Sequence, residues 1–168
     1  MGIVFIKVVK THSPALHSHR VSKVVTVFAF SANAADVTAQ GTTEDGLTWQ
    51  LTGDGVLTIS GSGAMQDYTA ASQGFSSYLT QAPWGELSDD VQSVVISSGV
   101  TSIGKNAFRG MTVESVSLPH GLTVIGDYAF SNAIGEGCVT EMTLPEGLKS
   151  IGRNAFTSSG LQSVTIPA

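Results

Sequence analysis

Alternating apolar and polar positions recur through the second half of the chain and predict one short strand in each of four successive segments. In each segment one residue separates two apolar residues, and in all but the first this residue is polar, which is the period of a strand with one buried face. A glycine follows each of the first three pairs, as expected for a turn that needs positive φ or close backbone approach. The apolar pairs are Val94/Ile96, Val116/Leu118, Met142/Leu144 and Val164/Ile166, and the glycines are Gly99, Gly121 and Gly147.

A second pattern follows each of the first three glycines, an Ile-Gly pair and then an Ala-Phe pair. These pairs end at Phe108, Phe130 and Phe156. Recurrence at a fixed register predicts a return segment whose Phe rings stack between neighbouring units, since one such unit cannot bury its own apolar face. The units begin 22, 26 and 22 residues apart and cover residues 91–112, 113–138, 139–160 and, in part, 161–168.

The combination of a strand ending in Ile/Leu-Pro, then Gly-Leu/Val-x-x-Ile-Gly and Ala-Phe, resembles the BspA-like (treponemal-type) leucine-rich repeat of surface proteins. This resemblance implies a β-rich solenoid of about three and a half leucine-rich repeats over residues 91–168. Residues 41–68 and the Ala82-Pro83-Trp84 segment are similar to the region that commonly precedes such repeats.

Residues 35–90 are predicted to form a β-rich module that caps the first repeat. Leu47, Trp49 and Leu51 alternate, as do Leu57 and Ile59, and the Thr-Gly-Asp-Gly sequence between them is typical of a hairpin turn. Such a hairpin would cover the exposed edge of the first unit. Residues 69–88, rich in Ser, Gln and Ala, are predicted to be a loop anchored by Trp84.

Residues 1–34 are predicted to be a signal or leader segment. An apolar run at 24–32 follows Arg20 and Lys23, and Ala32-Asn33-Ala34 has the small-x-small pattern that precedes a signal-peptidase cut. The alternative is a disordered or partly helical tail. The run is too short to span a bilayer, so no membrane span is expected.

The last strand pattern ends close to Ala168, and no further unit follows to cover Val164 and Ile166. The expectation is a fragment of a longer array, with self-association at this edge as the alternative. Cys138, the single cysteine, is predicted to be a small buried residue, and the four extra residues of the second unit, around 134–136, to form a loop.

Charge excludes one class of partner. All 13 acidic residues lie at or after Asp36, where only four of the eight Lys and Arg residues are found, so this part carries a net charge of −9. Because such a surface repels phosphate backbones, we expect no nucleic-acid binding.

No residue pattern indicates catalysis, a metal or a cofactor. His120, the only histidine after the leader, stands in a Pro-His-Gly turn without a nucleophile pattern. Gly61-Ser62-Gly63 lacks the rest of a phosphate-loop motif, and Asp89-Asp90 lacks a spaced series of metal ligands. Three histidines lie within the leader without Cys or carboxylate ligands nearby: His12, His17 and His19.

The remaining candidate site is the outward row of the repeat strands, which would align into one hydrogen-bonding face. The alternative is that this row is only the solvated side of a sheet. We therefore expect a non-catalytic, secreted or cell-surface module that binds a protein or cell-surface ligand, or else a structural spacer of a larger surface protein. The outward residues are Ser93, Val95, Ser115, Ser117, Glu141, Thr143, Ser163 and Thr165.

Overall fold

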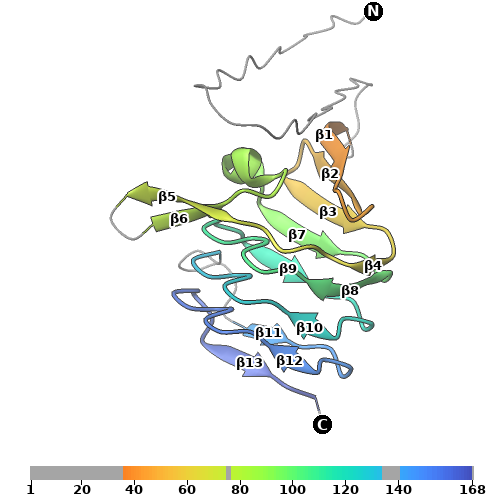
Figure 1. Ribbon diagram of the computed structural model, residues 1–168, viewed down its shortest axis with the longest axis vertical. Coiled ribbons are helices and arrows are strands. Elements are labelled where there is room, and N and C mark those ends of the chain that lie inside the picture. Colours follow the sequence, from red (N-terminus) through yellow and green to blue (C-terminus); the bar gives the residue numbers. More distant parts are fainter. Residues whose placement is uncertain (1–35, 75–76, 134–140, 168) are drawn as a thin grey trace, which may run out of the picture.

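The computed structural model describes residues 36–74, 77–133 and 141–167. Within them the chain forms strands β1 to β13 and one short 3₁₀ helix, η1 (Gly85–Asp90), with no α-helix (Figure 1). The expected β-rich leucine-rich-repeat fold class agrees with this strand content.

The N-terminal part of the chain and the first two repeat units share one five-stranded sheet. Its order is β1-β2-β3-β7-β9, antiparallel up to β3 and parallel from β3 onward. The predicted hairpin is confirmed as β2 and β3, because the alternating residues Leu47, Trp49, Leu51, Leu57 and Ile59 are all buried. The strands are β1 (Val37–Thr42), β2 (Thr48–Thr52), β3 (Val56–Ser60), β7 (Ser93–Ile96) and β9 (Ser115–Ser117).

Each of the first three repeat units contributes two strands, so the prediction of one strand per unit is wrong. Together with β4, which precedes the repeat units, these second strands form a separate parallel sheet of order β12-β10-β8-β4. Three of these four strands are only two residues long, too short to show a period, and pairing with the neighbouring strand defines them as strands. They are β4 (Gly63–Ala64), β8 (Val100–Ile103), β10 (Val124–Ile125) and β12 (Ser150–Ile151).

The remaining strands form two pairs. β11 (Glu141–Thr143) and β13 (Ser163–Thr165) pair in parallel, whereas β5 (Ala70–Gly74) and β6 (Ser77–Thr80) pair antiparallel. The expectation of a loop over residues 69–88 is therefore wrong, because this segment holds the β5–β6 hairpin and most of η1. Its small polar residues carry no apolar alternation, and the hairpin is held instead by backbone pairing, including Thr80 N–H to the Arg109 carbonyl at 2.8 Å.

Stacked aromatic rings form the centre of the core. Phe108 and Phe130 lie 5.2 Å apart between ring centroids and Phe130 and Phe156 lie 5.6 Å apart, with interplanar angles of 12° and 3°. The predicted stacking of the repeat Phe rings is confirmed. Trp84, the predicted anchor, is fully buried and extends the stack at 5.6 Å from Phe108, while its indole N–H donates to the Ala107 carbonyl at 2.9 Å.

The turn glycines only partly meet expectation. A Cβ on Gly99 would approach the Gly61 carbonyl oxygen to 2.0 Å, which confirms a close backbone approach at Gly99. A Cβ on Gly121 or Gly147 would meet no atom closer than 3.5 Å, and none of the three glycines has positive φ. Positive φ occurs instead just before each Ala-Phe pair. The residues that adopt it are Asn106, Tyr128 and Asn154, with φ of 55°, 56° and 54°.

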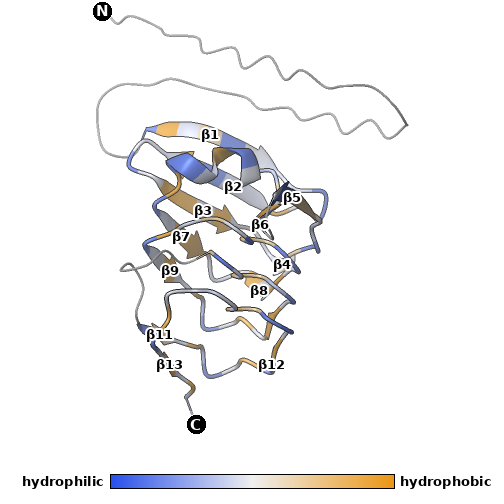
Figure 2. Cartoon of the chain, turned by 90° about the vertical axis from the view of Figure 1, so that its left-hand side faces the viewer, coloured by the Kyte–Doolittle hydropathy of each residue, from blue (hydrophilic) through white to orange (hydrophobic). Residues whose placement is uncertain are grey.

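The apolar side chains near the C-terminus are exposed, as the sequence predicted: Val164 by 42% and Ile166 by 72%. Figure 2 shows the strands in two columns, with β7, β9, β11 and β13 along one side and β4, β8 and β12 along the other. The predicted leader with its histidines, the extra residues around 134–136 and Cys138 all lie outside the described residues.

Candidate functional site

The first half of the predicted face is assembled in one sheet. Ser93 on β7 pairs with Ser115 on β9, and Val95 pairs with Ser117. The alternate residue Val94 is buried, so the side chains on either side of it point away from the core. The structure therefore brings these four predicted residues together on one outward surface.

The second half of the predicted face lies in another sheet. Glu141 on β11 pairs with Ser163 on β13, and Thr143 pairs with Thr165, and all four are exposed. Within the described residues no strand ladder joins β9 to β11. Figures 1 and 2 nevertheless show β11 and β13 following β9 along the same side of the molecule.

The outward surface continues into the N-terminal strands, which sequence reasoning did not include. The row through Val95 and Ser117 passes through Thr58 on β3, Gln50 on β2 and Gln40 on β1. The signal was present in the sequence for Gln50 and Thr58, which alternate with the buried positions of the predicted hairpin, whereas Gln40 lies on a strand that was not predicted. We use the term strand face for the predicted row together with Gln40, Gln50 and Thr58.

The chemistry of the strand face is that of hydroxyl and amide groups. Glu141 is its only ionisable side chain, and Gln50 Nε2 donates to Gln40 Oε1 at 3.3 Å across neighbouring strands. These groups donate and accept hydrogen bonds, but they include neither a general base nor an activated nucleophile. Groups of this kind can form hydrogen bonds with the surface of a partner.

The other sequence candidates are dispersed. His120 is exposed, and Asp89 and Asp90 are exposed at the end of η1. Gly61, in the turn after β3, and Gly63, the first residue of β4, both have positive φ. The described part of the chain contains no group of three His, Cys, Asp or Glu side chains that could hold a metal ion. Within the same ranges, no helix has the length and apolar character needed to cross a bilayer.

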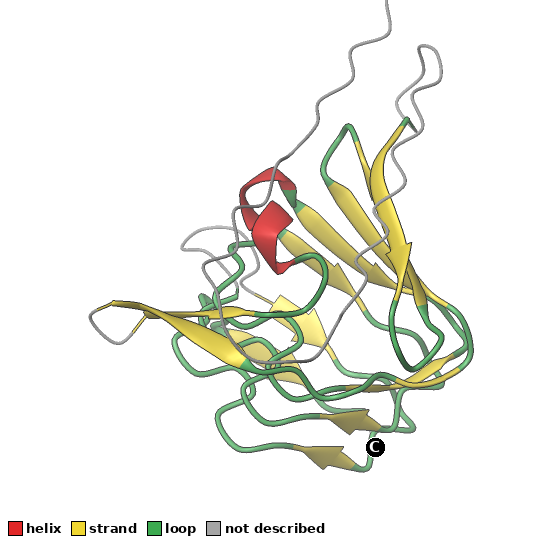
Figure 3. Ribbon diagram, turned by 45° about the horizontal axis from the view of Figure 1, so that its top comes forward, coloured by secondary structure: helices red, strands yellow, loops and turns green. Residues whose placement is uncertain are grey.

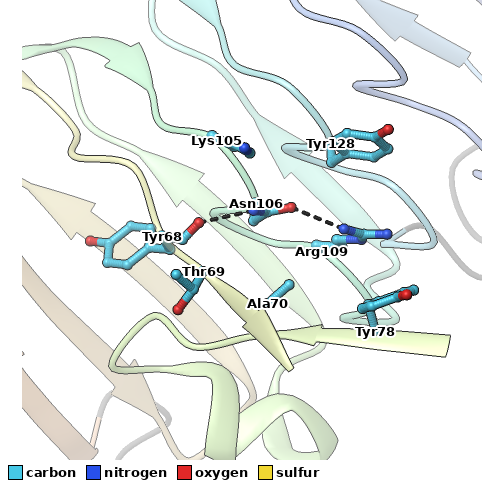
Figure 4. Close-up of a pocket in the computed structure, with 8 residues that line it drawn as sticks. All are labelled: Tyr68, Thr69, Ala70, Tyr78, Lys105, Asn106, Arg109 and Tyr128. Atoms are coloured by element: carbon cyan, nitrogen blue, oxygen red, sulfur yellow. Dashed lines mark hydrogen bonds between the residues drawn. The ribbon is translucent and has the colours of Figure 1, made fainter. Parts of the chain in front are cut away.

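A pocket that the sequence did not predict lies where the β5–β6 hairpin meets the repeats. It has a volume of about 490 Å³, and Arg109 lies at its centre between two tyrosine rings (Figure 4). The Arg109 guanidinium carbon is 4.2 Å from the Tyr78 ring centroid and 4.6 Å from that of Tyr128. The lining residues are Tyr68, Thr69, Ala70, Tyr78, Lys105, Asn106, Arg109 and Tyr128. We call this the Arg109 pocket.

Hydrogen bonds fix the floor of the Arg109 pocket. Arg109 Nη1 donates to Asn106 Oδ1 at 3.3 Å, and Asn106 Nδ2 donates to the Tyr68 carbonyl at 2.9 Å. Burial raises the pKa of the Tyr68 hydroxyl above its ordinary value, and the negative charge of Asp45 raises it further. Tyr68 therefore stays neutral over the physiological range, and the charge of the pocket comes from Lys105 and Arg109.

Comparison with known proteins identifies the repeats. The family model described as a BspA-type leucine-rich repeat region of six copies matches residues 87–168. No curated protein matches the chain.

Three solved structures are similar to this chain, and all are leucine-rich repeat proteins. One from Eubacterium ventriosum is 27% identical, with a TM-score of 0.50 over 70% of this chain and 37% of its own length. One from Bacteroides capillosus is 20% identical, with a TM-score of 0.43 over 73% of this chain and 94% of its own. The Treponema pallidum protein is 26% identical, with a TM-score of 0.39 over 74% of this chain and 66% of its own.

The chain thus spans little more than a third of the E. ventriosum protein, although the two share the leucine-rich repeat fold. The repeat signature read from the sequence, the stacked Phe rings and the family match all fall on the same residues. Residues 87–168 belong to the BspA-type leucine-rich repeat family.

Proposed function

We propose that the chain is a non-catalytic, secreted or cell-surface module that binds a protein or cell-surface ligand, as an adhesion module does, through its strand face. One observation carries this proposal: Gln40, Gln50, Thr58, Val95 and Ser117 form one uncharged row across five paired strands. Exclusion of charge from the centre of a surface is typical of protein interfaces. Leucine-rich repeat modules generally bind proteins, which supports the same reading.

We further propose that the repeats form a solenoid and that residues 35–90 cap its first edge. The parallel pairing of β3 with β7 and of β4 with β8, together with the stack from Trp84 to Phe156, supports this arrangement. A cap blocks strand addition at an open sheet edge. Export would be directed by residues 1–34.

The strand face is tested with arginine substitutions at two of its exposed positions. Proteins from the extracellular surroundings of the source cell are captured on the immobilised chain, and each captured protein is purified for affinity measurement. Ser115→Arg and Thr143→Arg each add a long charged side chain to the strand face without disturbing a buried residue. The matched control is Thr101→Arg, an exposed position on β8 in the other sheet.

We expect both strand-face variants to weaken binding by about tenfold or more, while Thr101→Arg changes it by less than about twofold, because an unpaired charge within an interface carries a desolvation cost. Circular dichroism spectra of the three variants should be identical. Unchanged affinity in both strand-face variants would remove the strand face as the site. The alternative role, a structural spacer of a larger surface protein, stays a prediction and would be favoured by failure to capture any partner.

A further inference from the structure

We propose that the Arg109 pocket is a second binding site, separate from the strand face, and that it binds the carboxylate of an acidic segment in a partner protein. That the partner is a protein rests on the proposed function; the specificity for a carboxylate rests on the pocket itself. Three separate parts of the chain build the site: the hairpin provides Tyr78, the first repeat unit provides Lys105 and Arg109, and the second provides Tyr128 (Figure 4).

The side chains of the pocket depart from the repeat pattern. Arg109 follows Phe108, but the residues at the same position of the next two units are Ser131 and Thr157. Tyr128 precedes its Ala-Phe pair, where the neighbouring units both have asparagine, Asn106 and Asn154. Stacking of the units does not require Arg or Tyr at these positions, because the other units stack without them.

Tyr128 occupies its position at a conformational cost. Its φ is 56°, a left-handed conformation that asparagine adopts far more readily than an aromatic residue does. An unfavourable backbone conformation that is retained at a pocket is a reason to look for a function. The ring of Tyr128 lies over the Arg109 guanidinium, so the function that fits is the positioning of that cation.

The two rings leave the guanidinium suited to a planar anion. Tyr78 and Tyr128 cover its two faces, so a ligand can pair only with donors along its edge. Nη1 is already bonded to Asn106, and Nε is buried without a hydrogen-bond partner among the described residues. Because Nε is buried, a carboxylate would accept two parallel N–H bonds from Nη1 and Nη2 at the end of the guanidinium, where Nη1 keeps a second hydrogen.

Charge distribution points to the same ligand. Residues 35–168 contain only four Lys and Arg side chains against 13 acidic ones, and two of the four line this pocket. Lys105 is exposed at its rim. A local concentration of positive charge in an otherwise acidic surface admits an anion at one place and repels it elsewhere.

The pocket is tested by titrating the isotope-labelled full-length chain with hexaglutamate and recording amide chemical shifts by NMR at low ionic strength. Hexaglutamine at equal concentration tests whether carboxylates are needed for binding. Glucuronate tests whether an acidic sugar, and not a peptide, can supply the carboxylate. The key variant is Tyr128→Asn, which installs the residue of the neighbouring units and so retains the fold. Arg109→Gln removes the cation, and Arg153→Gln is the matched control, since Arg153 is exposed and does not line the pocket.

Hexaglutamate should shift the signals of Tyr78, Arg109 and Tyr128, and its dissociation constant should rise by about tenfold in Tyr128→Asn and Arg109→Gln but by less than about twofold in Arg153→Gln. The proposal is overturned by absence of these shifts, by equal binding of hexaglutamine, by an equal effect of Arg153→Gln, or by binding of glucuronate alone. Ser115→Arg should leave the titration unchanged, so failure of the strand face and failure of this pocket are distinguishable.

Discussion

At the scale of single residues, Phe130 lies inside the ring stack, between two other rings. Phe108 covers one face of its ring and Phe156 the other, and the side chain is fully buried. We expect Phe130→Ala to lower the free energy of unfolding by about 3–5 kcal/mol, because neighbouring repeat units cannot easily close the cavity. Urea denaturation measures the loss. Phe156→Ala is the control and should lower the free energy of unfolding clearly less, since Phe156 is only partly buried. Equal losses of stability in the two variants would show that enclosure within the ring stack is not the cause.

The second residue-scale prediction concerns the Ile-Gly pairs. A Cβ on Gly104 would lie 1.8 Å from the Gln66 carbonyl oxygen, whereas a Cβ on Gly147 would meet nothing closer than 3.5 Å. Gly104→Ala should therefore destabilise the protein by about 1–3 kcal/mol through forced backbone movement, and Gly147→Ala should change stability by less than about 0.5 kcal/mol. Thermal unfolding of the two variants side by side checks this. Similar unfolding temperatures for both would contradict it.

Single residues of the core were predictable where the pattern was local. The Phe positions and the alternating hairpin residues could be assigned from the sequence, because burial follows from the period of a strand or a repeat. The Arg109 pocket could not be assigned. Tyr78 and Arg109 are far apart in the sequence, and only the docking of a hairpin that carries no apolar pattern brings them together.

At the scale of elements, Gly110 determines how the β5–β6 hairpin lies against the first repeat unit. Its φ is 76°, and an added Cβ would lie 2.0 Å from the Tyr78 carbonyl oxygen. We expect Gly110→Ala to displace the hairpin and to lower hydrogen-exchange protection of the Thr80 amide, which donates to the Arg109 carbonyl. Protection of the amides in β7 should remain.

Gly74→Ala is the matched control for the hairpin. Gly74 also has positive φ, 92°, but a Cβ there would meet no atom within 4 Å. Alanine at this position therefore has the same backbone strain but no steric clash. Hydrogen-exchange protection of the Thr80 amide should persist in this variant. If both variants expose Thr80 equally, contact with Gly110 does not hold the hairpin.

Elements were predictable from the sequence only where they had a period of their own. β2, β3, β7, β9, β11 and β13 have alternating apolar residues, and all were expected. β10 and β12 span two residues each and are defined by their parallel partners, β5 consists of Ala, Ser, Gln and Gly, and β6 has the sequence Ser-Tyr-Leu-Thr, without apolar alternation. Non-local pairing of this kind leaves no periodic signal in a single sequence.

At the scale of the whole molecule, the boundary that the sequence suggested at residue 91 is not a break in the structure. Leu57 on β3 pairs with Val94 on β7, and Gly63 on β4 pairs with Val100 on β8. The segment from β3 to β4 thus pairs in parallel with the first unit, as that unit pairs with the second. Figure 3 shows the strands in yellow and the short helix in red. The repeat signature begins at residue 91 because the preceding segment lacks the Ile-Gly and Ala-Phe pairs, although β3 and β4 pair in parallel with β7 and β8.

This continuity predicts a single cooperative unfolding transition. Both tryptophans, Trp49 and Trp84, precede residue 91, so their fluorescence reports the N-terminal strands, whereas far-ultraviolet circular dichroism reports the whole chain. Trp84 stacks on Phe108 and Leu57 is fully buried on the strand that pairs with β7, so these strands cannot unfold without exposing the core of the first repeat unit. The two probes should therefore give coincident urea transitions.

A substitution at the junction tests the same coupling more sharply. Leu57→Ala should lower stability by about 2–5 kcal/mol, and it should move the fluorescence and circular dichroism transitions together, because the lost contacts belong to one shared core. A separate N-terminal unit would respond differently: its fluorescence transition alone would move to lower urea, and the repeats would unfold at their original midpoint. That outcome would show that the ladder between β3 and β7 joins two independently stable parts and that residue 91 is a true domain boundary.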